Sequence, residues 1–122
     1  MPATIDTAEG TIVLQPLFDA IVADFERFSS YTGPERTAQL TAAFRDTLAV
    51  SPTTAASKYA RIVAQHGTGH DSVWGFVVLK DDGKFRRGDV LKADGWKGPA
   101  KNFVRGRVDD TDLSWVKWTS AS

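Results

Sequence analysis

The chain of 122 residues has 42% hydrophobic content, no cysteine and a formal net charge of zero. That length and apolar fraction predict one ordinary hydrophobic core and a single domain over residues 1–122. The absence of cysteine excludes disulfides, thiolate metal ligands and cysteine nucleophiles. No stretch approaches the roughly 18 apolar residues of a membrane span, and Met1–Thr4 lacks the basic flank of a signal peptide, so we expect a cytoplasmic protein with no membrane partner.

The zero net charge hides a division along the chain. Residues 1–79 carry five basic and eight acidic residues, whereas residues 80–122 carry ten basic and seven acidic ones, a difference of −3 against +3. Duplex-DNA binders that rely on counterion release usually show a much stronger basic stripe. The pattern favours a site for a small anion instead.

The N-terminal half predicts helices. Residues 1–11 show no sustained period and predict either a short edge strand or a loose arm. Apolar residues then recur at helical spacing with acids between them, and Pro16 suits the first turn, where its missing N–H costs nothing. This stripe consists of Leu14, Leu17, Phe18, Ile21, Val22, Phe25 and Phe28.

A second helix is predicted over residues 34–49, after the breaker at residues 31–34. Its expected apolar face consists of Leu40, Ala43, Phe44 and Leu48. The helical part thus spans about residues 12–50. Residues 57–65 mix alanines, which favour helix, with Tyr59, Ile62 and Val63, which favour strand, and we predict a strand.

Beyond residue 70 the pattern changes to short β-like segments separated by turn residues. A hairpin-type turn is expected at residues 81–83 and a loop at residues 94–99. The predicted strands are Val73–Leu79, Phe85–Lys92, Phe103–Val108 and Leu113–Trp118. The expected fold class is α+β, with two N-terminal helices packed on a mostly antiparallel C-terminal sheet that spans about residues 57–118.

The sequence offers little for catalysis. His66 and His70 flank two glycines, so they do not share a helical face for a metal, and a solvated turn is the favoured interpretation. Most carboxylates lie in turns, where they bond to the local backbone. No nucleophile elbow or phosphate-binding P-loop motif occurs. We therefore expect no enzyme activity, no cofactor and no metal.

Residues 88–108 combine cations, rings and glycines. This mixture offers flat faces for a base, guanidinium groups for phosphate and an amide for base or ribose edges. The alternative is that Trp96, Phe103, Trp115 and Trp118 only pack, while the cations form a solvated face. With two rings from the preceding strand, the predicted ligand-binding residues are Trp74, Phe76, Lys92, Trp96, Lys101, Asn102, Phe103, Arg105 and Arg107. Lys58 and Arg61 form a possible second anion site.

The same segment resembles a signature of small bacteriophage proteins, the Thoeris anti-defence protein 1 family. The matching residues are Gly88-Asp89-Val90, Lys92, Trp96-Lys97, Pro99-Ala100-Lys101 and Arg105-Gly106, within a similar region of about residues 57–108. Members of that signature often have asparagine after Arg-Gly where this chain has Arg107, which leaves ligand specificity open.

The resemblance implies a protein that sequesters an immune signalling molecule without cleaving it. The implied ligand is a cyclic ADP-ribose isomer made by TIR-domain enzymes, held where two subunits of a homodimer meet. The family also includes larger homo-oligomers with sites for cyclic di- and trinucleotides. The implied location is the bacterial host cytoplasm.

Three alternatives remain open from the sequence. A small phage protein that binds single-stranded nucleic acid would also use basic residues interleaved with aromatics. An interaction protein could block a host enzyme through its exposed helices. An enzyme that degrades the same ligand would release an altered product.

Overall fold

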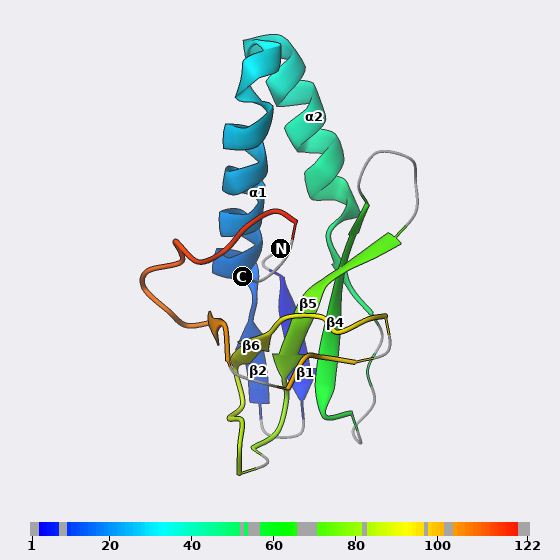
Figure 1. Ribbon diagram of the computed structural model, residues 1–122, viewed down its shortest axis with the longest axis vertical. Coiled ribbons are helices and arrows are strands. Elements are labelled where there is room, and N and C mark those ends of the chain that lie inside the picture. The colour runs from blue at the N-terminus through cyan, green and yellow to red at the C-terminus, as the bar shows by residue number, and fades with distance from the viewer. Residues whose placement is uncertain are drawn as a thin grey trace.

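The computed structural model describes residues 3–7, 10–51, 53, 57–65, 71–81, 83–96, 98–101 and 104–119. It confirms the α+β class, with two helices and two antiparallel sheets (Figure 1). In chain order the elements are β1 (Thr4–Thr7), β2 (Gly10–Val13), α1 (Gln15–Ser29), the 3₁₀ turn η1 (Ser30–Thr32), α2 (Pro34–Thr47), β3 (Ala49–Val50), β4 (Tyr59–Gln65), β5 (Asp71–Val78), β6 (Asp89–Leu91) and β7 (Gly106–Arg107).

Strands β1 and β2 form an antiparallel hairpin where the sequence predicts a single edge strand or an arm. The register pairs Thr4 with Val13 and Thr7 with Gly10. Ile5 and Ile12 lie opposite each other and are both buried in the main core. Each strand has only one buried apolar residue, which is too few to show a period, and this explains why the sequence pattern missed the hairpin.

Helix α1 confirms the predicted apolar stripe except at its end, where Phe28 is 55% exposed. Leu17, Ile21 and Val22 are buried, and Pro16 lies in the first turn. The helix ends at two serines, where the Ser29 hydroxyl donates to the Phe25 carbonyl at 2.8 Å. Such local side-chain bonds compete with further helix and favour termination.

Helix α2 begins at Pro34, after Gly33 with φ of +93°, and its buried face differs from the predicted one. Thr37, Thr41 and Phe44 are buried, whereas Ala43 is exposed. The Phe44 ring stacks on that of Phe25, with ring centres 4.3 Å apart, and this contact turns the threonine row toward α1. Among the helices that the structure describes, none is both long and apolar enough to cross a membrane.

The second sheet has the strand order β3-β4-β5-β6-β7, with every neighbouring pair antiparallel. Strand β4 confirms the strand predicted over residues 57–65, and β5 confirms Val73–Leu79 with shifted ends. Ile62 pairs with Gly75 and Val63 with Val73, so Trp74 is the extra residue of a β-bulge. A bulge re-aims the side chain that it carries.

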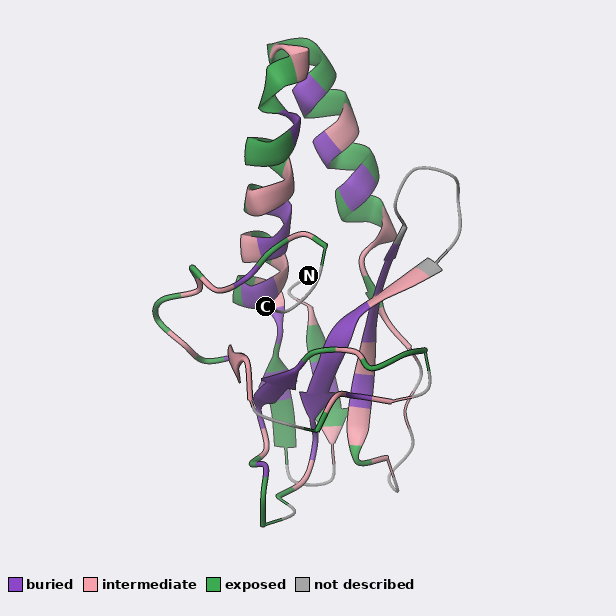
Figure 2. Ribbon diagram, viewed as in Figure 1, coloured by how far each residue is buried: buried purple, intermediate pink, exposed green. Residues whose placement is uncertain are grey.

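Each face of this sheet contributes to a separate apolar cluster. Figure 2 shows buried residues along β4, β5 and β6. The larger cluster joins Ile62, Trp74 and Val77 to the helices and the N-terminal hairpin. The smaller cluster lies on the other face and contains Phe76, Val78, Phe85 and Leu91. Regular alternation would place Trp74 with Phe76, and the bulge moves it to the larger cluster instead.

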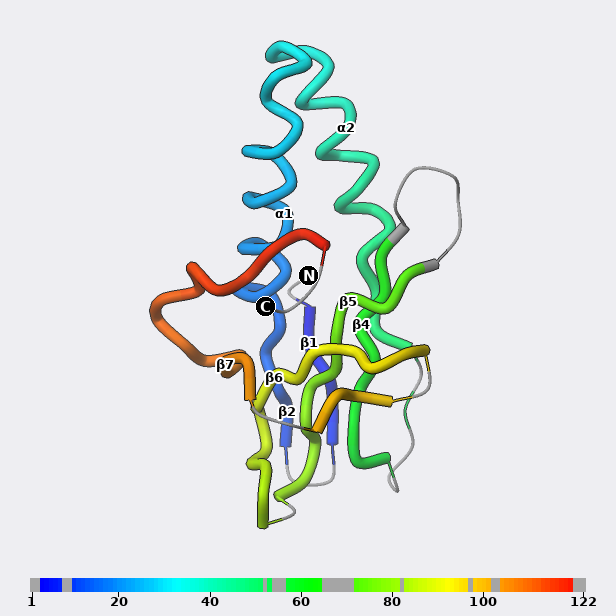
Figure 3. Tube along the Cα trace, in the orientation of Figure 1, coloured from blue at the N-terminus to red at the C-terminus, as the bar shows by residue number. Residues whose placement is uncertain are grey.

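The predicted strands after residue 84 are wrong in part. Only Asp89–Leu91 of Phe85–Lys92 is strand, because residues before it form a turn with Gly88 at φ of +94°. Only Gly106–Arg107 of Phe103–Val108 is strand, and Phe103 lies outside the described residues. Leu113–Trp118, all described, form no strand and belong to a C-terminal stretch that passes across α1 (Figure 3). The expected turn at residues 66–70 lies outside the described part, as does Asp82.

The crossing segment is anchored to the helical hairpin by Trp118. Its ring lies 5.2 Å from that of Phe25, 4.9 Å from Phe28 and 6.0 Å from Phe44, measured between ring centres. Its backbone N–H donates to the Asp24 carboxylate at 2.9 Å. Packing, and not strand pairing, therefore determines the path of this segment.

Candidate functional site

A loop between β6 and β7, residues 92–101, presents the most exposed tryptophan that the structure describes. The loop folds back on itself: the Asp94 N–H donates to the Gly98 carbonyl at 3.1 Å, and the Ala100 N–H to the Lys92 carbonyl at 2.7 Å. Ala93 and Pro99 form an isolated bridge between its two arms. Trp96 lies at the turn and is 48% exposed. The loop therefore holds a large apolar ring in solvent with its own backbone bonds.

Arg61 of β4 fixes Trp96 against the sheet. Its guanidinium carbon lies 4.7 Å from the centre of the Trp96 ring, and its Nε donates to the Trp96 carbonyl at 2.8 Å. The same guanidinium lies 5.9 Å from the Phe76 ring. Figure 3 shows the 92–101 loop reaching across β5 toward β4. Arg61, predicted for a separate anion site, thus supports the tryptophan of the first one.

Next to Trp96 lies a hollow that we call the tryptophan recess. Its volume is about 590 Å³. The Lys101 ammonium lies over the Tyr59 ring at its edge, 5.6 Å from the ring centre. The recess is lined by Tyr59, Asp94, Gly95, Trp96, Gly98, Pro99 and Lys101. It therefore combines two rings, a cation and a carboxylate.

A second hollow, which we call the hydroxyl recess, shares Tyr59 with the tryptophan recess and has a volume of about 270 Å³. It is lined by Ser51, Thr53, Ser57, Lys58, Tyr59, Arg61 and Phe76. Backbone bonds place its two walls: the Ser51 N–H donates to the Arg61 carbonyl at 2.9 Å, and the Leu79 N–H to the Lys58 carbonyl at 2.8 Å. Among the described residues that line it, none is acidic.

Tyr59 belongs to both recesses and was not among the predicted site residues. The signal was present, because Tyr59 and Arg61 are two positions apart in a strand and so share a face. Its detection required placing residues 57–65 next to the 92–101 loop, which no local pattern indicates.

Trp74 packs in the core and lines neither recess, whereas Phe76 packs in the smaller cluster and also lines the hydroxyl recess. Trp74 is 1% exposed, and its indole N–H donates to the Lys117 carbonyl at 2.6 Å. Phe76 is also buried and reaches only the wall of the hydroxyl recess. Buried rings satisfy the apolar core first, and Trp74 has its polar group satisfied there as well.

Arg107 lies away from both recesses, at the opposite end of β6. It pairs with Asp89 at 2.5 Å and with Asp109 at 3.0 Å, and its guanidinium also donates to the Arg87 carbonyl at 3.0 Å. Burial lowers the pKa of Arg107, but the hydrogen bonds and negative charges of Asp109 and Asp89 outweigh that effect and raise it above its usual value. Its charge is used within the fold.

The remaining predicted residues divide into two groups. Lys92 is exposed and Arg105 half-buried, and the described linings of the two recesses include neither. The Arg105 N–H donates to the Val90 carbonyl at 2.8 Å, which places Arg105 beside β6. Asn102 and Phe103 lie outside the described residues, as do His66 and His70. In the described ranges no group of three or more His, Cys, Asp or Glu could hold a metal ion.

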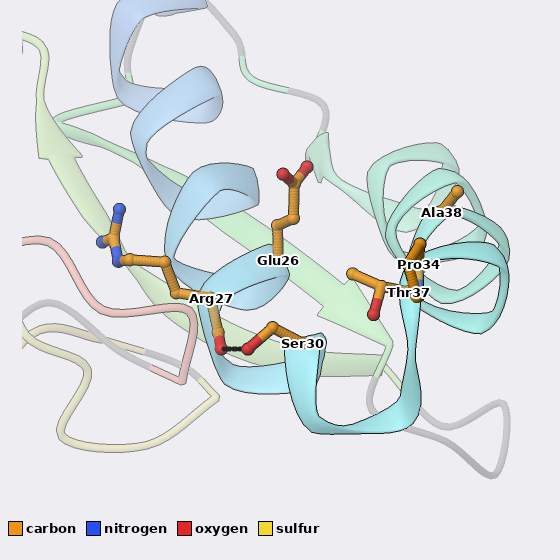
Figure 4. Close-up of a pocket in the computed structure, with 6 residues that line it drawn as sticks. All are labelled: Glu26, Arg27, Ser30, Pro34, Thr37 and Ala38. Atoms are coloured by element: carbon orange, nitrogen blue, oxygen red, sulfur yellow. Dashed lines mark hydrogen bonds between the residues drawn. The ribbon is translucent and has the colours of Figure 1, made fainter.

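A further hollow lies near the tip of the α1–α2 hairpin (Figure 4). It has a volume of about 530 Å³ and is lined by Glu26, Arg27, Ser30, Pro34, Thr37 and Ala38. Figure 4 shows Glu26 and Arg27 extending to different sides of α1, and Arg27 pairs with Asp24 at 3.0 Å. None of the described residues that line it is aromatic. It therefore lacks the rings and converging charges of the tryptophan recess.

Comparison with known proteins gives one family. A family model described as a family of unknown function (DUF7717) matches residues 12–117, which include both helices, the five-stranded sheet and the residues of both recesses. No curated protein and no solved structure matches the chain. Because the match covers most of its length, the chain belongs to the DUF7717 family.

Proposed function

We propose that the protein binds a small, flat, anionic molecule of the nucleotide type in the tryptophan recess and sequesters it intact. The observation that carries this proposal is the Trp96 ring, held half-exposed by Arg61 next to the Lys101–Tyr59 pair. An exposed ring ordered by a cation offers a stacking face for a base. Lys101 supplies positive charge, and Asp94 can accept bonds from a base amino group or a ribose hydroxyl.

Typical magnitudes set the affinity that one chain can provide. Stacking on one aromatic ring contributes about 1–3 kcal/mol. Two charge-assisted hydrogen bonds add about 1.5–3 kcal/mol each, before desolvation costs. The sum supports dissociation constants from millimolar to micromolar, since 1 µM corresponds to about 8.2 kcal/mol. Tight sequestration therefore requires further contacts, which a second subunit would supply.

The resemblance to Thoeris anti-defence protein 1 gives the specific form of the proposal. In that form the ligand is a cyclic ADP-ribose isomer, or a cyclic oligonucleotide, in a phage-infected bacterial cytoplasm, and the protein is a homodimer or larger homo-oligomer. Two features of the recess suit such a ligand. Its rings can stack on a base, and its lining carries both a cation and a carboxylate, which suits a small molecule with phosphates and hydroxyls better than a long polyanion.

A single-stranded nucleic acid is the competing ligand. The same ring and cations would suit it. Two observations count against a nucleic acid. Asp94 in the recess repels a phosphate backbone, and a chain of zero net charge offers that backbone no overall electrostatic attraction. The small molecule is therefore the favoured ligand.

Calorimetry with AMP, ADP-ribose, cyclic ADP-ribose isomers and a cyclic dinucleotide tests the proposal, with an octanucleotide as the competing ligand. We expect saturable binding of at least one small molecule and at least a tenfold loss in Trp96→Ala. Tyr31→Ala is the matched control, because Tyr31 is 81% exposed at the tip of the helical hairpin. Heating the complex should release unchanged ligand. Binding of the octanucleotide alone, or release of a cleaved product, would contradict the proposal.

A further inference from the structure

The two recesses that share Tyr59 differ in chemistry. The tryptophan recess has an exposed indole and the Asp94 carboxylate, which suit a base and a ribose. The hydroxyl recess has two cations and the hydroxyls of a serine- and threonine-bearing wall, and its described lining contains no carboxylate. Hydroxyl and cationic donors without a competing acid are what a phosphate oxygen requires.

The recesses are joined through Tyr59 and Arg61. Tyr59 lines both, and its ring carries the Lys101 ammonium on the side of the tryptophan recess. Arg61 lines the hydroxyl recess while its guanidinium stacks on Trp96. One ligand that passes Tyr59 could therefore contact both recesses at once.

Arg61 has donors to spare for such a ligand. Its Nε is used by the Trp96 carbonyl, and its two terminal nitrogens have no hydrogen-bond partner among the described residues. No described carboxylate pairs with it either, in contrast to Arg107. A planar guanidinium with both terminal groups available can bind two oxygens of one phosphate.

We propose that the hydroxyl recess is the phosphate subsite of the same ligand, so that the nucleoside lies against Trp96 and Asp94 and the phosphate lies against Lys58 and Arg61. This inference rests on the proposed function and adds an orientation to it. It also moves the phosphate contact from residues 101–107 of the chain to Lys58 and Arg61, at the start of β4. The ligand class is a nucleoside 5′-phosphate or a larger molecule that contains one.

The test compares adenosine with AMP on the full chain. Lys58 is exposed and lines only the hydroxyl recess among the two, so Lys58→Ala leaves the tryptophan recess complete. We expect Lys58→Ala to weaken AMP about tenfold while adenosine is unaffected, whereas Asp94→Asn should weaken both by the same factor. Arg36→Ala, on the exposed surface of α2, is the charge-matched control and should change neither.

The outcomes separate the inference from the proposed function. If wild-type protein binds AMP or ADP-ribose and Lys58→Ala binds it equally well, the phosphate subsite is wrong and the proposed function stands. If Lys101→Ala alone reduces the preference for AMP over adenosine, the phosphate lies in the tryptophan recess and the orientation is reversed. If none of adenosine, AMP and ADP-ribose binds the wild type, both ideas fail. Circular dichroism of each variant verifies that it is folded.

Discussion

The 92–101 loop and the C-terminal segment of residues 104–119 contain the same kinds of residue and use them differently. In the loop, Trp96 stays half-exposed, and Lys101 contacts a ring. In the C-terminal segment, Trp118 packs between helices and Arg107 is paired with two aspartates. A tryptophan or an arginine indicates a binding site only where the fold leaves its ring uncovered or its charge unneutralised.

The largest expected difference between an exposed and a buried tryptophan is the loss of folding stability when the ring is removed. Trp74→Ala should lower the free energy of unfolding by about 3–5 kcal/mol, because it removes a fully buried ring. Trp96→Ala should change it by less than about 0.5 kcal/mol. Urea denaturation followed by circular dichroism measures both. If Trp74→Ala does not fold, Trp74→Phe should still lose about 1 kcal/mol through the lost bond to Lys117. Equal losses of unfolding free energy in Trp74→Ala and Trp96→Ala would contradict the assignment of Trp74 to the core and Trp96 to the surface.

A pair of glycine substitutions sharpens the same contrast. A Cβ at Gly106 would lie 2.3 Å from the Trp115 ring, whose indole N–H donates to Asp110 at 3.0 Å. Gly106→Ala should therefore cost about 1–3 kcal/mol of stability, as overpacking does. Gly95→Ala has nothing within 4 Å of the new methyl group and should be neutral within about 0.5 kcal/mol. A thermal melt of each variant decides, and a neutral Gly106→Ala would mean that the Trp115 ring can move.

Substitutions at Arg107 and at Lys101 should have opposite effects: the first should lower stability and the second should weaken nucleotide binding. Arg107→Ala removes the partner of the buried Asp89 and should cost about 1–2 kcal/mol of stability, with no change in nucleotide affinity. Lys101→Ala should keep stability within about 0.5 kcal/mol and weaken nucleotide binding several-fold. Chemical denaturation and calorimetry on the same preparations give both readings. If Arg107→Ala loses nucleotide affinity while its stability is unchanged, Arg107 belongs to the binding site.

The smallest effect is a pH dependence of the C-terminal segment. The Ser114 N–H donates to the Asp112 carboxylate at 3.0 Å, and this bond lowers the pKa of Asp112. A lowered carboxyl pKa gives stability that is present above the unfolded value of about 3.9 and is lost as the pH falls through the folded value. The difference in melting temperature between wild type and Asp112→Asn should thus be small at neutral pH and shrink as the pH falls below the unfolded pKa of about 3.9. A difference that grows on acidification would have the wrong sign.

The sequence correctly predicted the elements that show a hydrophobic pattern over many consecutive residues. Helix α1 and strand β4 follow from their own side chains, Pro16 included. The face of α2 was wrong in part: Phe44 is buried and Leu48 packs against the core as predicted, but Ala43 is exposed. Thr37 and Thr41 are buried beside the Phe25–Phe44 stack, a contact between helices that no local pattern indicates. The strand over Leu113–Trp118 was wrong because apolar residues that pack on helices look the same as those of a strand.

The candidate site was half predictable. Trp96 and Lys101 follow from the unusual composition of residues 88–108. Trp74 was misplaced because a β-bulge between two registers has no sequence signature here and reverses the face on which a strand residue lies. Arg107 was misplaced because its aspartate partner on β6 is 18 positions away. Tyr59 was missed because its neighbours in the site come from a distant loop.

The bond between Trp118 and Asp24 joins positions 94 apart in the chain. Contacts of such long range form late, because the loop that they close is costly in chain entropy. During synthesis the two helices therefore leave the ribosome long before the ring that covers Phe25 and Phe44 is available. We expect nascent chains that stop before residue 104 to expose these phenylalanines and to depend on chaperones, whereas chains that include Trp118 do not.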